Sequence, residues 1–202
     1  MSKTTKNSHC TSSIRSHLRQ VGLSQRNRLS PSERHVFSQR ACTHATDYFT
    51  QQIADFSQII LAAYWPIRSE IDPRPLFHFV SSQGGFLALP AILDRTTMVF
   101  RTFSEEASLE SMQFGTFGPD ASHAVVAPTI IIVPLSAFDA QCHRLGYGGG
   151  YYDRAIAQLK QNGHSVQLFG LGFSCQEVES IPAAEHDLVL QGIFTEKGFL
   201  QC

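Results

Sequence analysis

The sequence has no long hydrophobic run and no excess of charge, and these two absences narrow the possible partners. The longest apolar stretches, such as IILAAYW at 59–65, are far too short to span a bilayer. Sixteen lysines and arginines stand against seventeen acidic residues, so the net charge is −1 and no global field favours nucleic acid or an anionic membrane surface. We therefore expect neither a membrane nor a nucleic acid as the partner.

The sequence also lacks paired cysteines. Its five cysteines are scattered, odd in number and without a CxxC motif. This pattern argues against a disulfide framework and a zinc site, and it favours a reducing compartment. We therefore expect a cytoplasmic protein in which Cys142 and Cys175 are free thiols.

No internal repeat, linker or low-complexity segment divides the chain. Its 202 residues, 43% of them hydrophobic, suffice for one sizeable core. No apolar signal-peptide core follows the start, and the basic, hydroxyl-rich residues 1–12 are predicted to be disordered. Residues 13–202 are predicted to form a single domain, which we expect to be a monomer.

Helix and strand patterns alternate along the chain. Apolar residues at helical spacing predict a helix from residue 13, and the capping box SPSE at 30–33 starts a second helix that runs to about Gln51. Further helices are predicted over 72–83 and 152–161, and strands over 57–66, 86–90, 97–103, 130–133, 166–173 and 188–195. The expected fold is α/β, with an N-terminal helical pair and an open, largely parallel sheet flanked by helices.

The segment HRLGYGGGYYDR at 143–154 places three glycines between a predicted strand and a predicted helix. Gly148, Gly149 and Gly150 let the backbone adopt positive φ and bring its N–H groups close to a ligand. The helix N-terminus beyond them adds partial positive charge, and the Arg144 guanidinium suits phosphate oxygens. The pattern predicts an anion site, most naturally for phosphate.

The residues around the glycines leave more than one interpretation open. The tyrosines offer flat faces to a ring, and Asp153 could hold a magnesium ion that bridges phosphates. The alternative is a flexible loop in which Asp153 caps the helix and the tyrosines pack. Tyr151 stands where a dinucleotide fingerprint needs glycine, and no GK[ST] follows as in a P-loop. The spacing alone therefore indicates phosphate, as in a nucleotide, and no more.

The longer stretch VPLSAFDAQCHRLGYGGGYYDR resembles the signature of the 5-formyltetrahydrofolate cyclo-ligase family, P-x-x-x-F-D-x-x-x-x-R-L-G-x-G-x-G-Y-Y-D. IRSHLR and RNRLSPSER are similar to the family's N-terminal helices, and YWPIRSEID to its Y-x-P-x-x-x-E-[IV]-[DE] stretch. IPAAEHDLVLQGIFTE is similar to its closing segment, so the resemblance runs from about Ser13 to Glu196. Two positions depart from the pattern. Arg15 replaces a common lysine, and FGPDAS replaces the usual glutamate-proline loop.

The resemblance implies ATP- and Mg²⁺-dependent conversion of 5-formyltetrahydrofolate to 5,10-methenyltetrahydrofolate, with ADP and phosphate as the other products. It also implies three groups of site residues. The ATP-binding group is Arg15, Arg19, Arg144, Leu145, Gly146, Tyr147, Gly148, Gly149, Gly150, Tyr151 and Tyr152. The folate-binding group is Trp65, Glu70, Tyr147, Gly148, Gly149, Gly150 and Tyr151. Asp153 and Asp187 correspond to the metal ligands, and Arg144 and Tyr151 are taken as catalytic.

Two alternatives to this function remain at the level of the sequence. A similar sheet could carry an isomerase or transferase for a phosphorylated metabolite, and the altered FGPDAS loop is compatible with a folate- or nucleotide-binding regulator without turnover. The basic N-terminus has its own alternative. Arg15 and Arg19 lie four residues apart on one helix face, which could be no more than a solvated flank.

Overall fold

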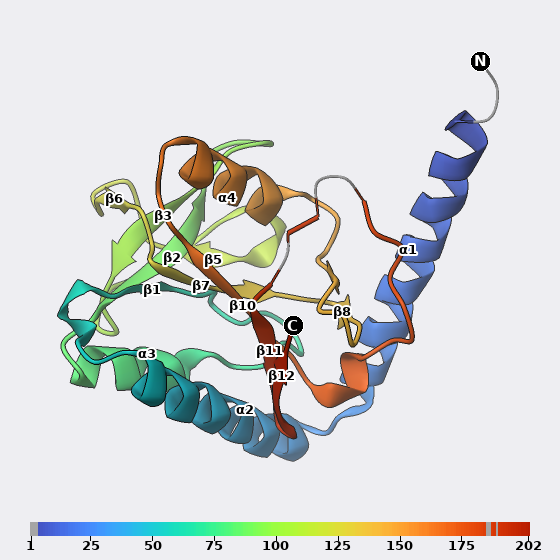
Figure 1. The fold of residues 1–202 in the computed structure, drawn as a ribbon. Coiled ribbons are helices and arrows are strands. Elements are labelled where there is room, and N and C mark those ends of the chain that lie inside the picture. Colours follow the sequence, from blue (N-terminus) through green and yellow to red (C-terminus); the bar gives the residue numbers. More distant parts are fainter. Residues whose placement is uncertain (1–3, 185–186, 189) are drawn as a thin grey trace.

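In the computed structural model, which describes residues 4–184, 187–188 and 190–202, helices lie on both faces of one large sheet (Figure 1). The α-helices are α1 (Thr4–Arg28), α2 (Pro31–Gln52), α3 (Arg74–Ser82) and α4 (Tyr151–Gln161). The strands of the large sheet are β1 (Ile60–Ala62), β2 (Phe86–Ile92), β3 (Met98–Phe103), β6 (Val125–Val126), β7 (Ile130–Pro134), β10 (Gln167–Leu171), β11 (Gly192–Thr195) and β12 (Gly198–Gln201). Two short hairpins consist of β4 (Glu110–Ser111) with β5 (Phe117–Gly118), and of β8 (Ala137–Phe138) with β9 (Arg144–Leu145).

The eight strands of the large sheet follow the order β12-β11-β10-β7-β1-β2-β3-β6. The five central strands, β11 to β2 in this order, pair in parallel, whereas β12, β3 and β6 join as antiparallel edges. The predicted single α/β domain with an open, largely parallel sheet is confirmed. Because parallel neighbours end at the same edge, the loops that follow β1 and β7 are brought to one side of the sheet.

The core lies in two layers, one on each face of the sheet. Along β7, Ile130 and Ile132 face the layer that contains α2 and α3, and Ile131 and Val133 face the layer that contains α4. All four side chains are at most 2% exposed. A strand buried on both faces reads as an unbroken apolar run, which is why IIIV was predictable as a central strand.

The helices begin largely where their caps predict. The Ser30 side chain accepts from the backbone of Glu33, whose carboxylate accepts from the Ser30 N–H, so α2 starts with the predicted capping box. Helix α1, in contrast, begins at Thr4, earlier than the start predicted at residue 13. No proline or glycine in this stretch stops the helix from extending toward its N-terminus. Residues 1–3 lie outside the described residues.

The prediction of a free thiol at Cys142 is wrong. Cys142, in the turn between β8 and β9, forms a disulfide with Cys202, which directly follows β12. The two residues are 60 positions apart, and only the fold brings them together, so their spacing carried no signal. Cys42 and Cys175 are free thiols, as predicted for Cys175. Within the described part of the chain, no helix has both the length and the apolar character that crossing a membrane requires.

Candidate active site

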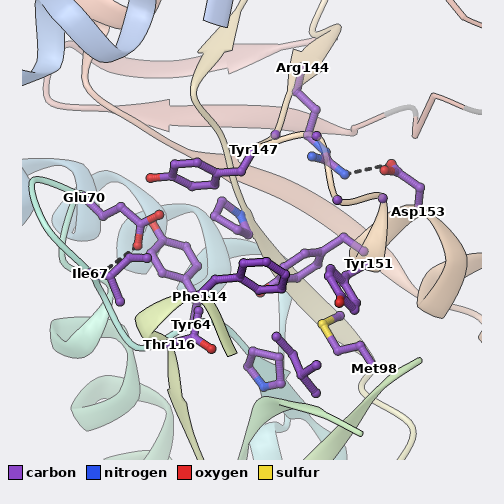
Figure 2. A pocket seen from close by; sticks show the side chains of 18 of the residues that line it. Tyr64, Ile67, Glu70, Met98, Phe114, Thr116, Arg144, Tyr147, Tyr151 and Asp153 are labelled. Carbon is purple, nitrogen blue, oxygen red and sulfur yellow. Dashed lines mark hydrogen bonds and ion pairs between the residues drawn. The ribbon is translucent and has the colours of Figure 1, made fainter. Parts of the chain in front are cut away.

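A cavity of about 410 Å³ opens where the loops after β1 and β9 meet the start of α4 and the inner side of α1 (Figure 2). Every site residue singled out from the sequence lines this cavity except Leu145. Leu145 is fully buried in β9 and packs in a small core cluster, so its side chain supports the loop and does not face the cavity. Residues from the first twenty positions and from the last twenty thus meet at one place.

The glycine loop joins β9 to α4, and its backbone explains the glycines. Gly148 and Gly150 have φ of 97° and 66°, a region that side chains rarely adopt. Gly150 is also the N-cap of α4, where a Cβ atom would come within 2.6 Å of the Arg154 guanidinium. A Cβ atom at Gly148 would lie 3.9 Å from the Arg19 guanidinium carbon, an ordinary van der Waals distance. The loop therefore brings bare backbone and a helix N-terminus to the cavity, as an anion site requires.

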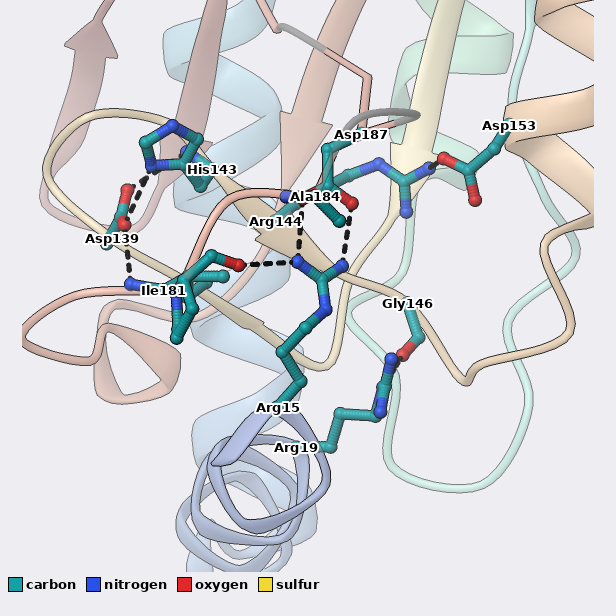
Figure 3. Close-up of polar contacts among 11 residues, drawn as sticks. Arg15, Arg19, Asp139, His143, Arg144, Gly146, Asp153, Ile181, Ala184 and Asp187 are labelled. Atoms are coloured by element: carbon teal, nitrogen blue, oxygen red, sulfur yellow. Dashed lines mark hydrogen bonds and ion pairs between the residues drawn. The ribbon is translucent and has the colours of Figure 1, made fainter. Parts of the chain in front are cut away.

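Arg144 is the buried cation of this site. Its side chain is only 6% exposed, and one terminal nitrogen donates to an Asp153 carboxylate oxygen at 2.9 Å (Figures 2 and 3). Burial lowers the pKa of Arg144, an effect that the charge of Asp153 opposes, and a guanidinium remains protonated in a protein. Its Nε atom is buried and has no hydrogen-bond partner among the described residues. The charged guanidinium of Arg144 therefore keeps one N–H group without a hydrogen-bond acceptor.

Two arginines of α1 reach the cavity from the other side (Figure 3). Arg15 donates to both oxygens of Asp187, each at 2.6 Å, and to the Pro182 carbonyl at 2.8 Å. Arg19 donates through Nε to the Gly146 carbonyl at 2.9 Å. Burial alone would raise the pKa of Asp187, but the hydrogen bonds from Arg15 and from the Ala184 N–H, together with the charges of Arg15 and Arg144, outweigh it and hold the pKa below its usual value. The basic face of α1 is part of the cavity wall and not a solvated flank.

The other end of the cavity holds a half-buried acid, Glu70. Burial raises the pKa of Glu70, although its carboxylate accepts from the Ile67 N–H at 2.9 Å and the Tyr147 hydroxyl also opposes the shift. Burial likewise raises the pKa of Tyr147 to about 12. Tyr147 accepts a hydrogen bond at 2.9 Å from Arg26, which is 2% exposed and also donates to Ser69. This end offers a carboxylate acceptor to the N–H groups of a ligand.

Sequence reasoning missed Arg26 and the apolar wall. Arg26 follows Arg15 by eleven residues, which is three helical turns, so the spacing on one helix face was a usable signal. The wall between the two ends consists of Tyr64, Pro90, Ile92, Met98, Phe114 and Thr116. Phe114 lies between β4 and β5 with φ of 63°, and its ring lies 5.9 Å from that of Tyr151. The stretch around Phe114 was predicted only as a polar, acidic loop, although Phe114 and Phe117 both line the cavity.

The acids of the cavity fit a metal only if a ligand completes the site. Asp153 and Asp187 both line the cavity, and each is paired with an arginine. The described residues contain no group of three or more His, Cys, Asp or Glu side chains placed to hold a metal ion. Magnesium in nucleotide sites usually takes one or two carboxylates together with phosphate oxygens and water. The two aspartates therefore suit a phosphate-bridged ion and not an all-protein cage.

An open α/β sheet with a glycine-rich loop, a helix N-terminus and converging arginines at one edge defines an enzyme that binds phosphate or a nucleotide. Within that class, the chain belongs to the 5-formyltetrahydrofolate cyclo-ligase family, whose model matches residues 11–196. Because it belongs to this family, the protein is a ligase of folate one-carbon metabolism. The ligase activity implies ATP as co-substrate.

Relatives and solved structures agree with this assignment. The chain is 30% identical over 183 residues to the 5-formyltetrahydrofolate cyclo-ligase of Haemophilus influenzae, covering 88% of this chain and 92% of that protein. It is 27% identical over 177 residues to the enzyme of that name from Escherichia coli K12, covering 85% and 94%.

The fold is similar to the NMR structure of Aquifex aeolicus 5,10-methenyltetrahydrofolate synthetase, with a TM-score of 0.73, 29% identity and coverage of 93% and 92%. A Mycoplasma pneumoniae 5,10-methenyltetrahydrofolate synthetase shares the fold at 22% identity, with a TM-score of 0.71 and coverage of 90% and 98%.

Proposed function

We propose that this enzyme uses ATP and Mg²⁺ to cyclise 5-formyltetrahydrofolate to 5,10-methenyltetrahydrofolate, releasing ADP and phosphate. The observation that carries the proposal is one cavity with a half-buried acid at one end and converging arginines with a glycine loop at the other. A pterin presents N–H donors that suit Glu70, and a triphosphate suits Arg15, Arg19 and Arg144. The two substrates would then meet in the middle of the cavity.

The chemistry needs this arrangement because an amide-like formyl oxygen is a poor leaving group. We propose that this oxygen attacks the γ-phosphorus of ATP, the bond from phosphorus to ADP breaks, and an imidate phosphate forms. N10 of the folate then adds to the activated carbon and loses its proton, the carbon–oxygen bond breaks, and phosphate departs. Both steps depend mainly on alignment and on charge stabilisation, which account for most of catalysis in phosphoryl transfer.

Each group of residues has a task in this proposal. Arg144 and the glycine loop hold the transferring phosphoryl group, while Arg15 and Arg19 bind the other phosphates. Trp65 and Tyr147 lie beside the pterin, whose N–H groups donate to Glu70. Tyr151 stands between the two substrates, with its hydroxyl donating to the Arg95 carbonyl at 3.0 Å, so its ring orientation is fixed. All these parts come from one chain, and we propose that it acts as a monomer.

Asp153 and Asp187 are the residues that would hold magnesium. When bound, the ion would supply positive charge that neutralises the triphosphate. In the structure Arg144 forms an ion pair with Asp153, and Arg15 forms one with Asp187. In this proposal both arginines also bind phosphate. Phosphates that engage the two arginines would free carboxylate oxygens for the metal.

The test is an assay of the purified protein with 5-formyltetrahydrofolate, ATP and magnesium, read by the near-ultraviolet absorbance of the methenyl product. We expect product and ADP in equal amounts, and none without magnesium or without ATP. ATP hydrolysis without folate would favour a different transferase. Binding of folate and ATP without any product would identify a regulator instead of an enzyme.

A further inference from the structure

A second cavity, of about 460 Å³, lies beside the folate end of the first. Arg68 and Tyr147 line both cavities, so the two are neighbours that share a wall. In Figure 2 the Tyr147 ring extends from the glycine loop toward Glu70 and away from Asp153. A ligand with a ring beside Tyr147 at the folate end therefore has the second cavity within reach of its other end.

The lining of the second cavity is basic. It contains Arg26, Arg28 and Arg68 and, among the residues described, no aspartate or glutamate. Arg28 and Arg68 are exposed, and their side chains form no ion pair or hydrogen bond with any residue that the structure describes. Glu70, two residues after Arg68, accepts instead from the Ile67 N–H. Two guanidinium groups without an acidic partner in one cavity favour an anionic ligand, because each can bind two carboxylate or phosphate oxygens at once.

Hydrogen bonds hold the two sides of this cavity together. Arg26 is 2% exposed, and its Nε donates at 3.0 Å to the Ser69 hydroxyl, which in turn donates to the Asn27 side-chain oxygen. The end of α1 is thereby fixed to the turn that carries Arg68. Arg68 itself has φ of 56°, a conformation that is costly for residues other than glycine and that clusters at binding sites. The cavity is therefore preformed.

The position of the cavity along α1 indicates which anion it takes. Arg28 follows Arg19 by nine residues, which is about 14 Å along the helix axis. The phosphates of ATP, which the proposed function places at Arg15 and Arg19, lie toward the other end of the helix. A folate whose pterin lies at Glu70 continues through an aminobenzoyl ring into a glutamate with two carboxylates. The negative charge of this substrate is thus at the end opposite the pterin, where the second cavity lies.

We propose that the second cavity binds the glutamate end of the folate, whose carboxylates accept hydrogen bonds from Arg28 and Arg68. This inference rests on the proposed function. Both arginines lie away from the reacting atoms, so they contribute to substrate binding and not to the chemical steps. Because both side chains are exposed, salt screens their attraction for the carboxylates, and their contribution falls as ionic strength rises.

Arg28→Gln and Arg68→Gln test this with two substrates, 5-formyltetrahydrofolate and its α,γ-diamide, which keeps the skeleton and has no carboxylate. Each variant should raise KM for the acid about three- to fivefold, the scale of an exposed ion pair, and the double variant should raise it by about tenfold. KM for the diamide should be the same in wild type and variants, because the diamide makes no charged contact. The values of kcat and of KM for ATP should not change.

Arg40→Gln is the matched control, because Arg40 is an exposed arginine of α2 that lines neither cavity. It should keep the wild-type KM for both substrates. A double variant with the wild-type KM for 5-formyltetrahydrofolate would overturn the inference and leave the proposed function intact. An equal rise of KM for acid and diamide would also overturn it, because the loss would then not involve the carboxylates. If wild type itself gives no methenyl product, the proposed function fails, and the inference fails with it.

Discussion

At the scale of single residues, the site is governed by charged groups that the fold has removed from water. Arg144 and Glu70 lie at opposite ends of one cavity, and burial shifts the pKa of each toward the neutral form. Such shifts cluster at functional sites, because a buried charge is retained where a ligand completes its interactions. A substitution at each of the two residues should therefore show whether its side chain binds a substrate or only packs in the cavity wall.

Arg144→Ala should lower kcat together with kcat/KM by at least about a hundredfold, because in the proposed mechanism the guanidinium faces phosphates whose charge shifts during transfer. Arg144→Lys should recover only part of the rate, since an ammonium lacks the bidentate fork. Single-turnover rates and melting temperatures measured on the same preparations check this. If Arg144 only packs in the wall, the alanine variant will be less stable and fully active per folded molecule.

Glu70→Gln should raise KM for the folate and leave KM for ATP nearly unchanged, because in the proposed binding mode the pterin donates to this carboxylate and ATP does not. A lost hydrogen bond to a charged acceptor corresponds to about 1.5–3 kcal/mol. Initial rates with each substrate varied in turn measure the two constants. Equal effects on both substrates would remove Glu70 from the folate end.

The same variant has a signature in the pH dependence of stability. The folded pKa of Glu70 is raised, so the native state binds more protons than the unfolded state between the two pKa values. The contribution of Glu70 to stability is therefore largest at low pH and falls as pH rises through that window. Glu70→Gln should be the more stable protein near neutral pH and should lack this part of the slope in melting temperature against pH.

At the scale of elements, periodicity and caps predicted the central strands and helices, and they failed where elements are short or meet a distant partner. The capping box of α2 and the apolar run of β7 were readable because each signal lies within a few consecutive residues. The β8–β9 hairpin was read as loop, since two-residue strands show no period. Arg144 therefore lies in a buried strand instead of a mobile loop. The sequence pointed to most of the residues that line the cavity, but it did not predict their rigid placement.

The contact of α1 with this hairpin offers an element-scale prediction at Gly22. A Cβ atom there would lie 2.2 Å from the Ser136 carbonyl oxygen, so Gly22→Ala forces α1 away from the hairpin. We expect the melting temperature to fall by roughly 5 °C, because overpacking costs about 1–3 kcal/mol and each kcal/mol shifts it by about 2–4 °C. KM for ATP should rise as well, because Arg15 and Arg19 move with the helix.

Ser24→Ala is the control for this helix, because Ser24 is exposed two residues further along α1. It should leave both the melting temperature and KM for ATP near wild type. Alanine is a better helix former than glycine, so a stability gain in Gly22→Ala would show that α1 tolerates the extra methyl group without moving.

At the scale of the whole molecule, contacts between distant segments hold the site together, and these are the contacts that sequence patterns do not reveal. Arg15 and Asp187 are 172 positions apart and form the closing ion pair of the cavity. The Cys142–Cys202 disulfide similarly joins the end of edge strand β12 to the hairpin that carries Arg144. Local spacing carries no information on such pairs, because only the packed sheet brings their partners together.

The disulfide gives the prediction that belongs to this scale. Closing a loop of 60 residues restricts the unfolded chain, so Cys202→Ser should lose about 2–4 kcal/mol of stability. Its melting temperature should lie roughly 5–10 °C below that of the oxidised wild type, at about 2–4 °C per kcal/mol. A reductant should lower the melting temperature of the wild type to that of the variant and leave the melting temperature of the variant unchanged.

Cys175→Ser, which removes a free thiol, is the control and should keep the wild-type response to reductant. A non-reducing peptide map without a Cys142–Cys202 peptide, or a melting temperature insensitive to reductant, would show that the sheet edge and the hairpin stay together without the bond.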